Sequence, residues 1–181
     1  MALYFFAIIL PEELSEKITS IKLEISDKYD TVHALKLFPH ITLKVPFEFN
    51  RELESQLIEG AENLSLNYPA FNLEFDGYGY FEKKHPVFFI RPEYNHRLNL
   101  LQKQIIDYMK SVFPFIISGH DRNFNPHVSL AYRDLSPENF VRLKKEFEGQ
   151  KFEAVCRVED FHLLMHNRKQ WEIVRKFKLK S

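Results

Sequence analysis

The chain has 181 residues, of which 45% are apolar and 28% are charged, so it has the composition of an ordinary globular protein that can bury a hydrophobic core. Basic and acidic residues both number 25, and a net charge of zero disfavours a protein that holds long nucleic acid through its phosphates. The single cysteine excludes an internal disulfide and a cysteine-rich zinc site, which favours a reducing, cytoplasmic compartment.

The first element is predicted to be a buried strand within Ala2–Leu10, the longest apolar run. This run is too short to span a bilayer and is poorly flanked for a secretory signal. Pro11 and the two glutamates after it suit the first turn of a helix. An apolar stripe with spacings of 4, 3 and 4 then predicts an amphipathic helix that ends near Tyr29 and lies on a sheet: Leu14, Ile18, Ile21 and Ile25.

The segment His40–Val45 alternates with a period of two, which predicts a strand. One face is apolar and is expected to enter the core: Ile41, Leu43 and Val45. The other face is polar and carries side chains with useful chemistry: His40, Thr42 and Lys44.

The remaining segments predict an alternation of helices and strands without a linker. Helices are expected over Arg51–Leu64, over Tyr94–Val112 before Pro114, and over Pro137–Glu148 with Ser136 as its cap. Strands are expected over Tyr68–Phe81 with a bend at Gly77 to Gly79, Val87–Arg91, His127–Arg133, Phe152–Met165 and Trp171–Leu179. We therefore expect a single domain over residues 1–181.

A five-residue pattern occurs twice in the chain. Proline, histidine, a β-branched residue, a hydroxyl residue and leucine follow one another at Pro39–Leu43 and again at Pro126–Leu130. Each copy lies on a predicted strand, so the histidine and the hydroxyl residue point from the same face, about 7 Å apart. A histidine next to a threonine is more often an ordinary buried residue than a catalyst, but two copies in the same order favour a function.

Two imidazoles and two hydroxyls facing each other across a cleft could cleave a phosphodiester without a metal or another cofactor. A neutral imidazole accepts a proton from water, and an imidazolium donates one to the leaving oxygen, because both forms coexist near a pKa of about 6.5. The hydroxyls of Thr42 and Ser129 could donate to the phosphate oxygens. The spacing alone does not reveal which histidine is the acid.

The paired motifs resemble the signature of the 2H phosphoesterase superfamily, which includes bacterial RNA 2′,5′-ligase-like proteins and cyclic phosphodiesterases. The resemblance covers essentially the whole chain, including the opening strand and helix and the closing strands with Trp171. It implies an α+β fold of two pseudo-symmetric lobes, each an antiparallel sheet with helices on its outer face, around a central cleft. It also implies opening of a 2′,3′-cyclic phosphate, or action on a 2′,5′ linkage, at a nucleotide or RNA end.

The resemblance assigns the catalytic roles to His40 and His127, and the phosphate-holding hydroxyls to Thr42 and Ser129. Ser129 replaces the commoner threonine of the second motif, which keeps the donor but loses the methyl group that restricts its rotamer. Further substrate contacts are expected from three residues near the motifs, without any metal site: Lys44, Tyr132 and Arg133. The expected partner is a small nucleotide or an RNA 3′ end, with no membrane and no obligate protein partner.

Three alternatives are open at this point. A binding module for nucleotides or RNA ends could keep the cleft without turnover, and a ligase-like protein could use the same residues in the joining direction. A purely structural domain would require His40 and His127 to be buried far apart.

Overall fold

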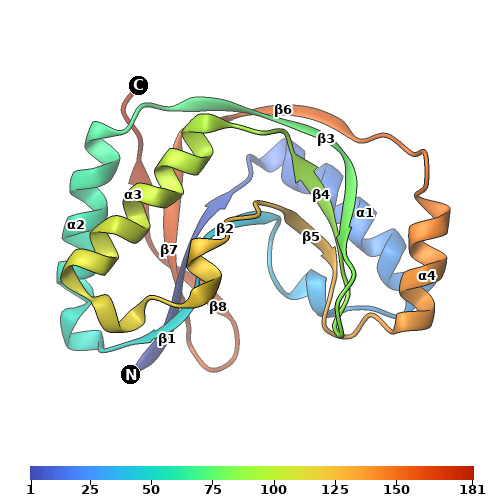
Figure 1. The fold of residues 1–181 in the computed structure, drawn as a ribbon, viewed down its shortest axis with the longest axis horizontal. Coiled ribbons are helices and arrows are strands. Elements are labelled where there is room, and N and C mark those ends of the chain that lie inside the picture. The colour runs from blue at the N-terminus through green and yellow to red at the C-terminus, as the bar shows by residue number, and fades with distance from the viewer.

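The computed structural model describes residues 1–181 and contains two four-stranded antiparallel sheets and four α-helices (Figure 1). The strands are β1 (Ala2–Ile9), β2 (His40–Phe49), β3 (Phe71–Phe81), β4 (Val87–Pro92), β5 (Val128–Ala131), β6 (Glu153–Val158), β7 (Asp160–His166) and β8 (Trp171–Lys178). The α-helices are α1 (Glu12–Tyr29), α2 (Glu54–Asn67), α3 (His96–Val112) and α4 (Pro137–Glu146). Short 3-10 helices include η1 (His33–Lys36) before β2 and η4 (Gly119–Arg122) before β5.

The two sheets are built on one plan. The first has the order β2-β1-β7-β8 and the second has the order β5-β4-β3-β6, so each sheet places a motif strand at its edge. The edge strands β2 and β5 contact each other where the two sheets meet. This arrangement confirms the predicted fold class of two pseudo-symmetric antiparallel lobes.

The helices are exchanged between the two halves of the chain. Helix α1 connects β1 and β2 of the first sheet, yet it packs against β5 and α4 on the second. Helix α3 connects β4 and β5 of the second sheet, yet it packs against β2 and α2 on the first. Figure 1 shows the resulting pairs, α2 with α3 at one end of the molecule and α1 with α4 at the other. Each sheet is thus covered by one helix from each half.

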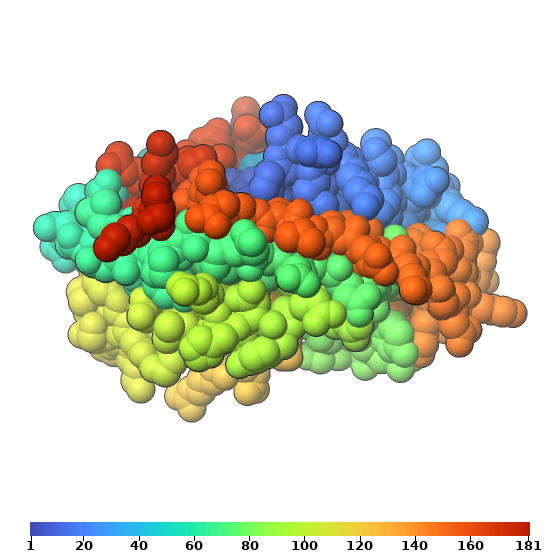
Figure 2. All heavy atoms as spheres, turned by 90° about the horizontal axis from the view of Figure 1, so that it is seen from above, coloured from blue at the N-terminus to red at the C-terminus, as the bar shows by residue number.

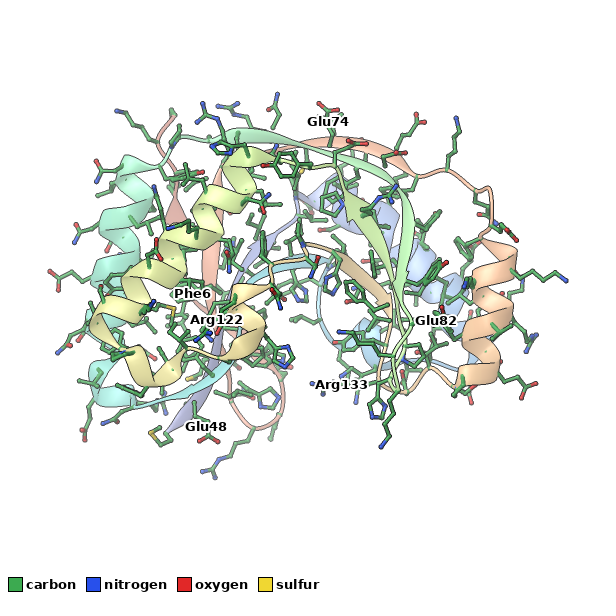
Figure 3. The ribbon with its side chains drawn as sticks, in the orientation of Figure 1. Phe6, Glu48, Glu74, Glu82, Arg122 and Arg133 are labelled. Carbon is green, nitrogen blue, oxygen red and sulfur yellow. The ribbon has the colours of Figure 1, made fainter.

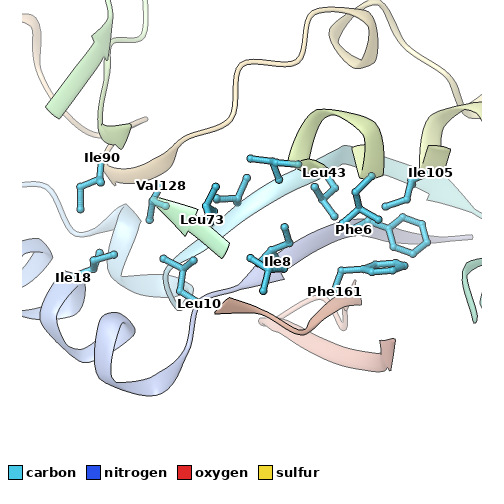
Figure 4. Close-up of a cluster of buried hydrophobic side chains, with 14 of the residues drawn as sticks. Phe6, Ile8, Leu10, Ile18, Leu43, Leu73, Ile90, Ile105, Val128 and Phe161 are labelled. Carbon is cyan, nitrogen blue, oxygen red and sulfur yellow. The ribbon is translucent and has the colours of Figure 1, made fainter. Parts of the chain in front are cut away.

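A hydrophobic core of 39 buried residues runs without a break through both halves. Figure 4 shows it passing from Phe6 and Phe161 of the first sheet, past Leu43, to Val128 and Ile90 of the second. The C-terminal segment also joins the halves, because β6 belongs to the second sheet and β7 to the first. Figure 2 shows this segment in orange along the surface, between α1 in blue and β3 in green.

Local chemistry explains where several elements begin and bend. The Asn95 side chain caps α3 by accepting a hydrogen bond from the backbone N–H of Leu98 at 3.0 Å, so the helix begins after Tyr94 and not at it. Ser136 caps α4 as predicted. The predicted bend in β3 is also present, since Gly77 has a φ of 70° at an irregularity in the pairing with β4.

Two further sequence-based boundaries are wrong. The predicted strand Phe152–Met165 is two strands, because the chain changes sheets at Glu159, whose carbonyl accepts the N–H of Leu179. Strand β5 ends at Ala131, so the period-two alternation does not extend to Arg133. Arg133 instead has a φ of 66°, which ends the strand conformation.

The placement of Lys44 on the same face as His40 is also wrong, and so is that of Val45 in the core, because Val45 is only half-buried and lies outside the hydrophobic cluster. Ala7 of β1 pairs with Thr42 and the preceding residue of β1, Phe6, pairs with Lys44, so a β-bulge lies between Thr42 and Lys44 on β2. Neighbouring residues of β1 face opposite sides of the sheet, and the bulge therefore turns Lys44 to the core side. Lys44 is 1% exposed.

Lys44 forms a buried ion pair with Asp121 of η4, with Nζ 3.1 Å from Oδ2 and both side chains 1% exposed. The same Oδ2 accepts the N–H and the hydroxyl of Ser118 at 2.7 and 2.9 Å. The pair fixes the loop before β5 to strand β2, and so it sets the position of the second motif relative to the first.

We expect Asp121→Asn to lower the free energy of unfolding by about 3–5 kcal/mol, because it leaves the Lys44 ammonium buried without a counter-charge. Urea titration measures the change. Asp107→Asn removes the exposed ion pair with Lys103 on α3 and serves as the control, with an expected loss below about 1 kcal/mol. Equal losses in the two variants would contradict the structural role of the buried pair.

Candidate active site

The two motif histidines are held in the same way. Nδ1 of His40 lies 2.9 Å from the carbonyl oxygen of Phe38, and Nδ1 of His127 lies 2.8 Å from that of Asn125. In each case the carbonyl belongs to the residue before a proline, whose backbone is restricted to extended conformations, and the proline fixes φ between carbonyl and histidine. A carbonyl only accepts, so Nδ1 carries the proton, and the lone pair of the neutral ring is on Nε2.

Aromatic rings surround each imidazole. The His40 ring lies 5.5 Å from that of Phe5 and 6.5 Å from that of Phe38. The His127 ring lies 5.1 Å from the rings of both Phe81 and Phe89. Gly79 makes room for this packing, because a Cβ there would lie 2.4 Å from the Phe89 ring. The rings limit rotation of both imidazoles.

The same rings remove water from the imidazoles. Burial, together with the positive charges of Lys22 and His127, lowers the pKa of His40 to about 4. Burial also lowers the pKa of His127, against the effect of the Asn125 carbonyl. The positive charge of His127 thus adds to the lowering of the His40 pKa, and the two histidines lie on strands that contact each other.

The hydroxyl residues lie beside the histidines. Thr42 pairs with Ala7, and Ser129 pairs with Phe89, the residue whose ring contacts His127. Thr42 and His127, one from each half of the chain, line the same cavity of about 210 Å³. The loop from His120 to Asn125, the end of β3 and Lys83 also contribute to its lining, and so do Leu43, Val45 and Gln102. His40 and Ser129 are half-buried and do not line this cavity.

The structure places the other expected contact residues differently. Arg133 is exposed just after β5, and Figure 3 shows it extending toward the space between the two halves of the ribbon. Tyr132 is half-buried and its ring lies 4.9 Å from that of His33 on η1. Lys44 is enclosed by its ion pair with Asp121 and does not reach the cavity.

Lys22 was not expected to bear on the site. It lies on α1 at the spacing of the buried stripe, four residues after Ile18 and three before Ile25, and it is 4% exposed. A charged residue inside an apolar stripe was the signal in the sequence that could have revealed it. A larger cavity, of about 690 Å³, lies between β3 and α4, but neither motif histidine lines it.

A family model described as the 2′-5′ RNA ligase superfamily matches residues 10–170, a span that contains both motifs and the strands that carry them. The chain belongs to the 2′-5′ RNA ligase superfamily. The recognition from the paired motifs is therefore confirmed, and an enzymatic phosphoesterase or ligase-like function is supported at the level of the family.

Several known proteins resemble this superfamily member. A candidate phosphoesterase of Geobacillus kaustophilus is 25% identical over 137 residues, which are 76% of this chain and 75% of the relative. The crystal structure of TT0787 of Thermus thermophilus has a TM-score of 0.73 at 21% identity, covering 100% of this chain and 99% of that one. Escherichia coli LigT in apo form has a TM-score of 0.69 at 21% identity, covering 99% and 98%. LigT has also been solved with 3′-AMP and with phosphate.

No set of three or more histidine, cysteine, aspartate or glutamate side chains is grouped so that it could hold a metal ion. None of the helices is both long enough and apolar enough to cross a bilayer.

The burial of His40 predicts a pH dependence of stability in this superfamily member. The unfolded chain binds a proton near pH 6.5, whereas folded His40 binds it only near pH 4. The unfolded state therefore holds more protons between these values, so stability falls as the pH falls from 6.5 to 4, by up to about 3 kcal/mol from this residue. Urea unfolding at pH 7 and pH 4.5 measures the loss.

We expect His40→Asn to lose less stability between the two pH values than the wild type. His85→Asn, in the exposed turn between β3 and β4, is the control and should behave as the wild type. A loss in His40→Asn as large as in the wild type would show that the folded protein does not disfavour the imidazolium.

Proposed function

We propose that this protein is a metal-independent phosphodiesterase that hydrolyses a 2′,3′-cyclic phosphate at a ribonucleotide or RNA end by general acid–base catalysis. The observation that carries the proposal is the matched pair of hydrogen bonds from Nδ1 to the carbonyls of Phe38 and Asn125. Both bonds leave Nε2 as the atom that exchanges a proton, and the two imidazoles lie on strands that meet.

The reaction would use one proton transfer at each imidazole. One neutral imidazole accepts a proton from water as the water oxygen forms a bond to phosphorus. The other, protonated, donates to the ribose oxygen as its bond to phosphorus breaks, leaving a phosphate monoester on the neighbouring ribose oxygen. Product release and exchange with solvent restore both protonation states, so a bell-shaped dependence of rate on pH follows.

The hydroxyls of Thr42 and Ser129 would hold the phosphate. A hydroxyl aimed at a non-bridging oxygen donates a hydrogen bond that strengthens as negative charge develops in the transition state. Lys83, which lines the cavity, and Arg133 beside the junction would add positive charge near the phosphate. A bound anion also raises the pKa of a nearby imidazole. The bound phosphate would therefore favour the protonated imidazole that the reaction needs and that burial disfavours in the free protein.

The size of the cavity favours recognition of an end. At about 210 Å³ it is smaller than the roughly 300–1,000 Å³ of pockets that enclose a drug-sized ligand. It would hold a phosphate and part of a ribose, with the rest of the substrate on the open surface. LigT bound to 3′-AMP, ATP or phosphate provides a precedent for such ligands in a protein of the same fold.

A second candidate is a binding module for phosphorylated nucleotide or RNA ends without turnover. It is favoured by the lowered pKa of both imidazoles, since neither would be protonated at neutral pH in the free protein. The joining reaction of a ligase-like protein would use the same residues, with each proton transfer in the opposite direction.

Hydrolysis of the four nucleoside 2′,3′-cyclic monophosphates in excess chelator tests the proposal, with the product phosphate located by ³¹P NMR. We expect His40→Ala and His127→Ala each to lower kcat by about 10²–10⁴, and the double variant to lose little more, because the two groups act as a unit. His96→Ala, at the exposed start of α3, is the control. Tight binding of 3′-AMP by a wild type that turns over none of the substrates would favour the binding module.

The hydroxyl residues give a separate expectation. Thr42→Val and Ser129→Ala should each lower kcat by about 10²–10³ if the hydroxyls donate to the phosphate in the transition state. Steady-state kinetics separates kcat from KM, and the folded state is checked by circular dichroism. A rise in KM with unchanged kcat would show that the hydroxyls hold only the bound substrate.

A further inference from the structure

A buried polar side chain on a helix supports the turn before each motif strand. In the first half, Nζ of Lys22 on α1 donates to the carbonyl oxygens of Ala34 and Leu37, at 3.0 and 3.1 Å. Ala34 lies in η1 and Leu37 directly follows it. The next carbonyl along the chain, that of Phe38, is the one that accepts the Nδ1 proton of His40. Lys22 therefore holds in place the segment 34–38, whose last carbonyl determines the tautomer of His40.

The second half has a neutral counterpart. Nε2 of Gln102 on α3 donates to the carbonyl oxygen of Asp121 in η4 at 3.2 Å, and Gln102 is 6% exposed. Helices α1 and α3 occupy equivalent places, because each joins the two neighbouring strands at the motif edge of a sheet. In each half a buried helix side chain thus donates to a carbonyl oxygen before the motif strand. That side chain is the ammonium of Lys22 in the first half and the amide of Gln102 in the second.

No carboxylate forms an ion pair with the Lys22 ammonium. Only carbonyl oxygens accept from it, whereas the other buried lysine, Lys44, has its charge balanced by Asp121. Burial lowers the pKa of Lys22 to about 8, so it remains largely charged at neutral pH. The positive charges of Lys22 and His127 both add to the lowering of the His40 pKa by burial. The cavity that His127 lines is also lined by three other ionisable residues, Lys83, His120 and Asp121, the last of which is paired with Lys44.

We propose that Lys22 is a positioning residue that reserves His40 for the role of general base. Its hydrogen bonds hold the segment that supplies the Phe38 carbonyl, and its charge opposes protonation of His40. His127, on the side supported by Gln102, is then the imidazole that carries the proton to the leaving oxygen. The two roles rest on the proposed function, but the effect of Lys22 on His40 is a property of the free protein.

Nitrogen-15 NMR of the labelled imidazoles in the ligand-free protein tests the effect directly. We expect wild-type His40 to carry its proton on Nδ1 and to titrate at lower pH than His127. Lys22→Gln keeps a donor but removes the charge, as in the other half, and should raise the pKa of His40 by roughly one unit without changing its tautomer. Lys22→Met removes the donor as well and should also mix the two tautomers.

Gln102→Met is the matched control, because it removes the support of the second half without changing a charge. It should leave the titration of His40 unchanged. In the same variants, the acidic limb of the pH profile of kcat/KM should move to higher pH in Lys22→Gln and stay in place in Gln102→Met.

An unchanged His40 titration in folded Lys22→Gln overturns the proposal, and so does a wild-type His40 that titrates at or above the pH of His127. The second result needs no variant, so the proposal stays testable even if the substitutions prevent folding. Absence of turnover on every cyclic phosphate would instead count against the proposed function and leave the imidazole titrations unaffected.

Discussion

The site depends on a hydrogen bond between a backbone carbonyl and Nδ1 of each motif histidine. Each carbonyl comes from the residue before a proline, so the same three-residue geometry is produced twice, at Phe38–His40 and at Asn125–His127. The bond leaves Nε2 to exchange protons, and the phenylalanine rings around each imidazole keep it from rotating away. Everything else in the fold serves to bring these two units together.

The exchange of helices between the halves achieves this. Because α1 packs on the second sheet and α3 on the first, neither half can bury its own sheet alone. The two edge strands are consequently held against each other by a core shared between the halves. The buried Lys44–Asp121 pair adds a directional link across the same junction, with a position that hydrophobic contacts alone would not specify.

Symmetry of the backbone does not extend to the electrostatics. The two halves place equivalent strands, turns and helices around the histidines, but an ammonium supports one turn and an amide the other. A reaction that needs one proton acceptor and one proton donor benefits from this difference, since two identical imidazoles would compete for the same role.

The sequence by itself determined the type and order of most elements and the two motifs that identify the family. Periodicity of two or 3.6 residues reports which side chains share a face, and it indicated α1, α4 and the first part of the strand of His40, up to Leu43. It could not show the bulge that turns Lys44 into the core, the change of sheet at Glu159, or the partner of Lys22. Those features depend on contacts between residues far apart in the chain, and only the tertiary structure decides them, because local periodicity carries no information about which distant group fills a buried position.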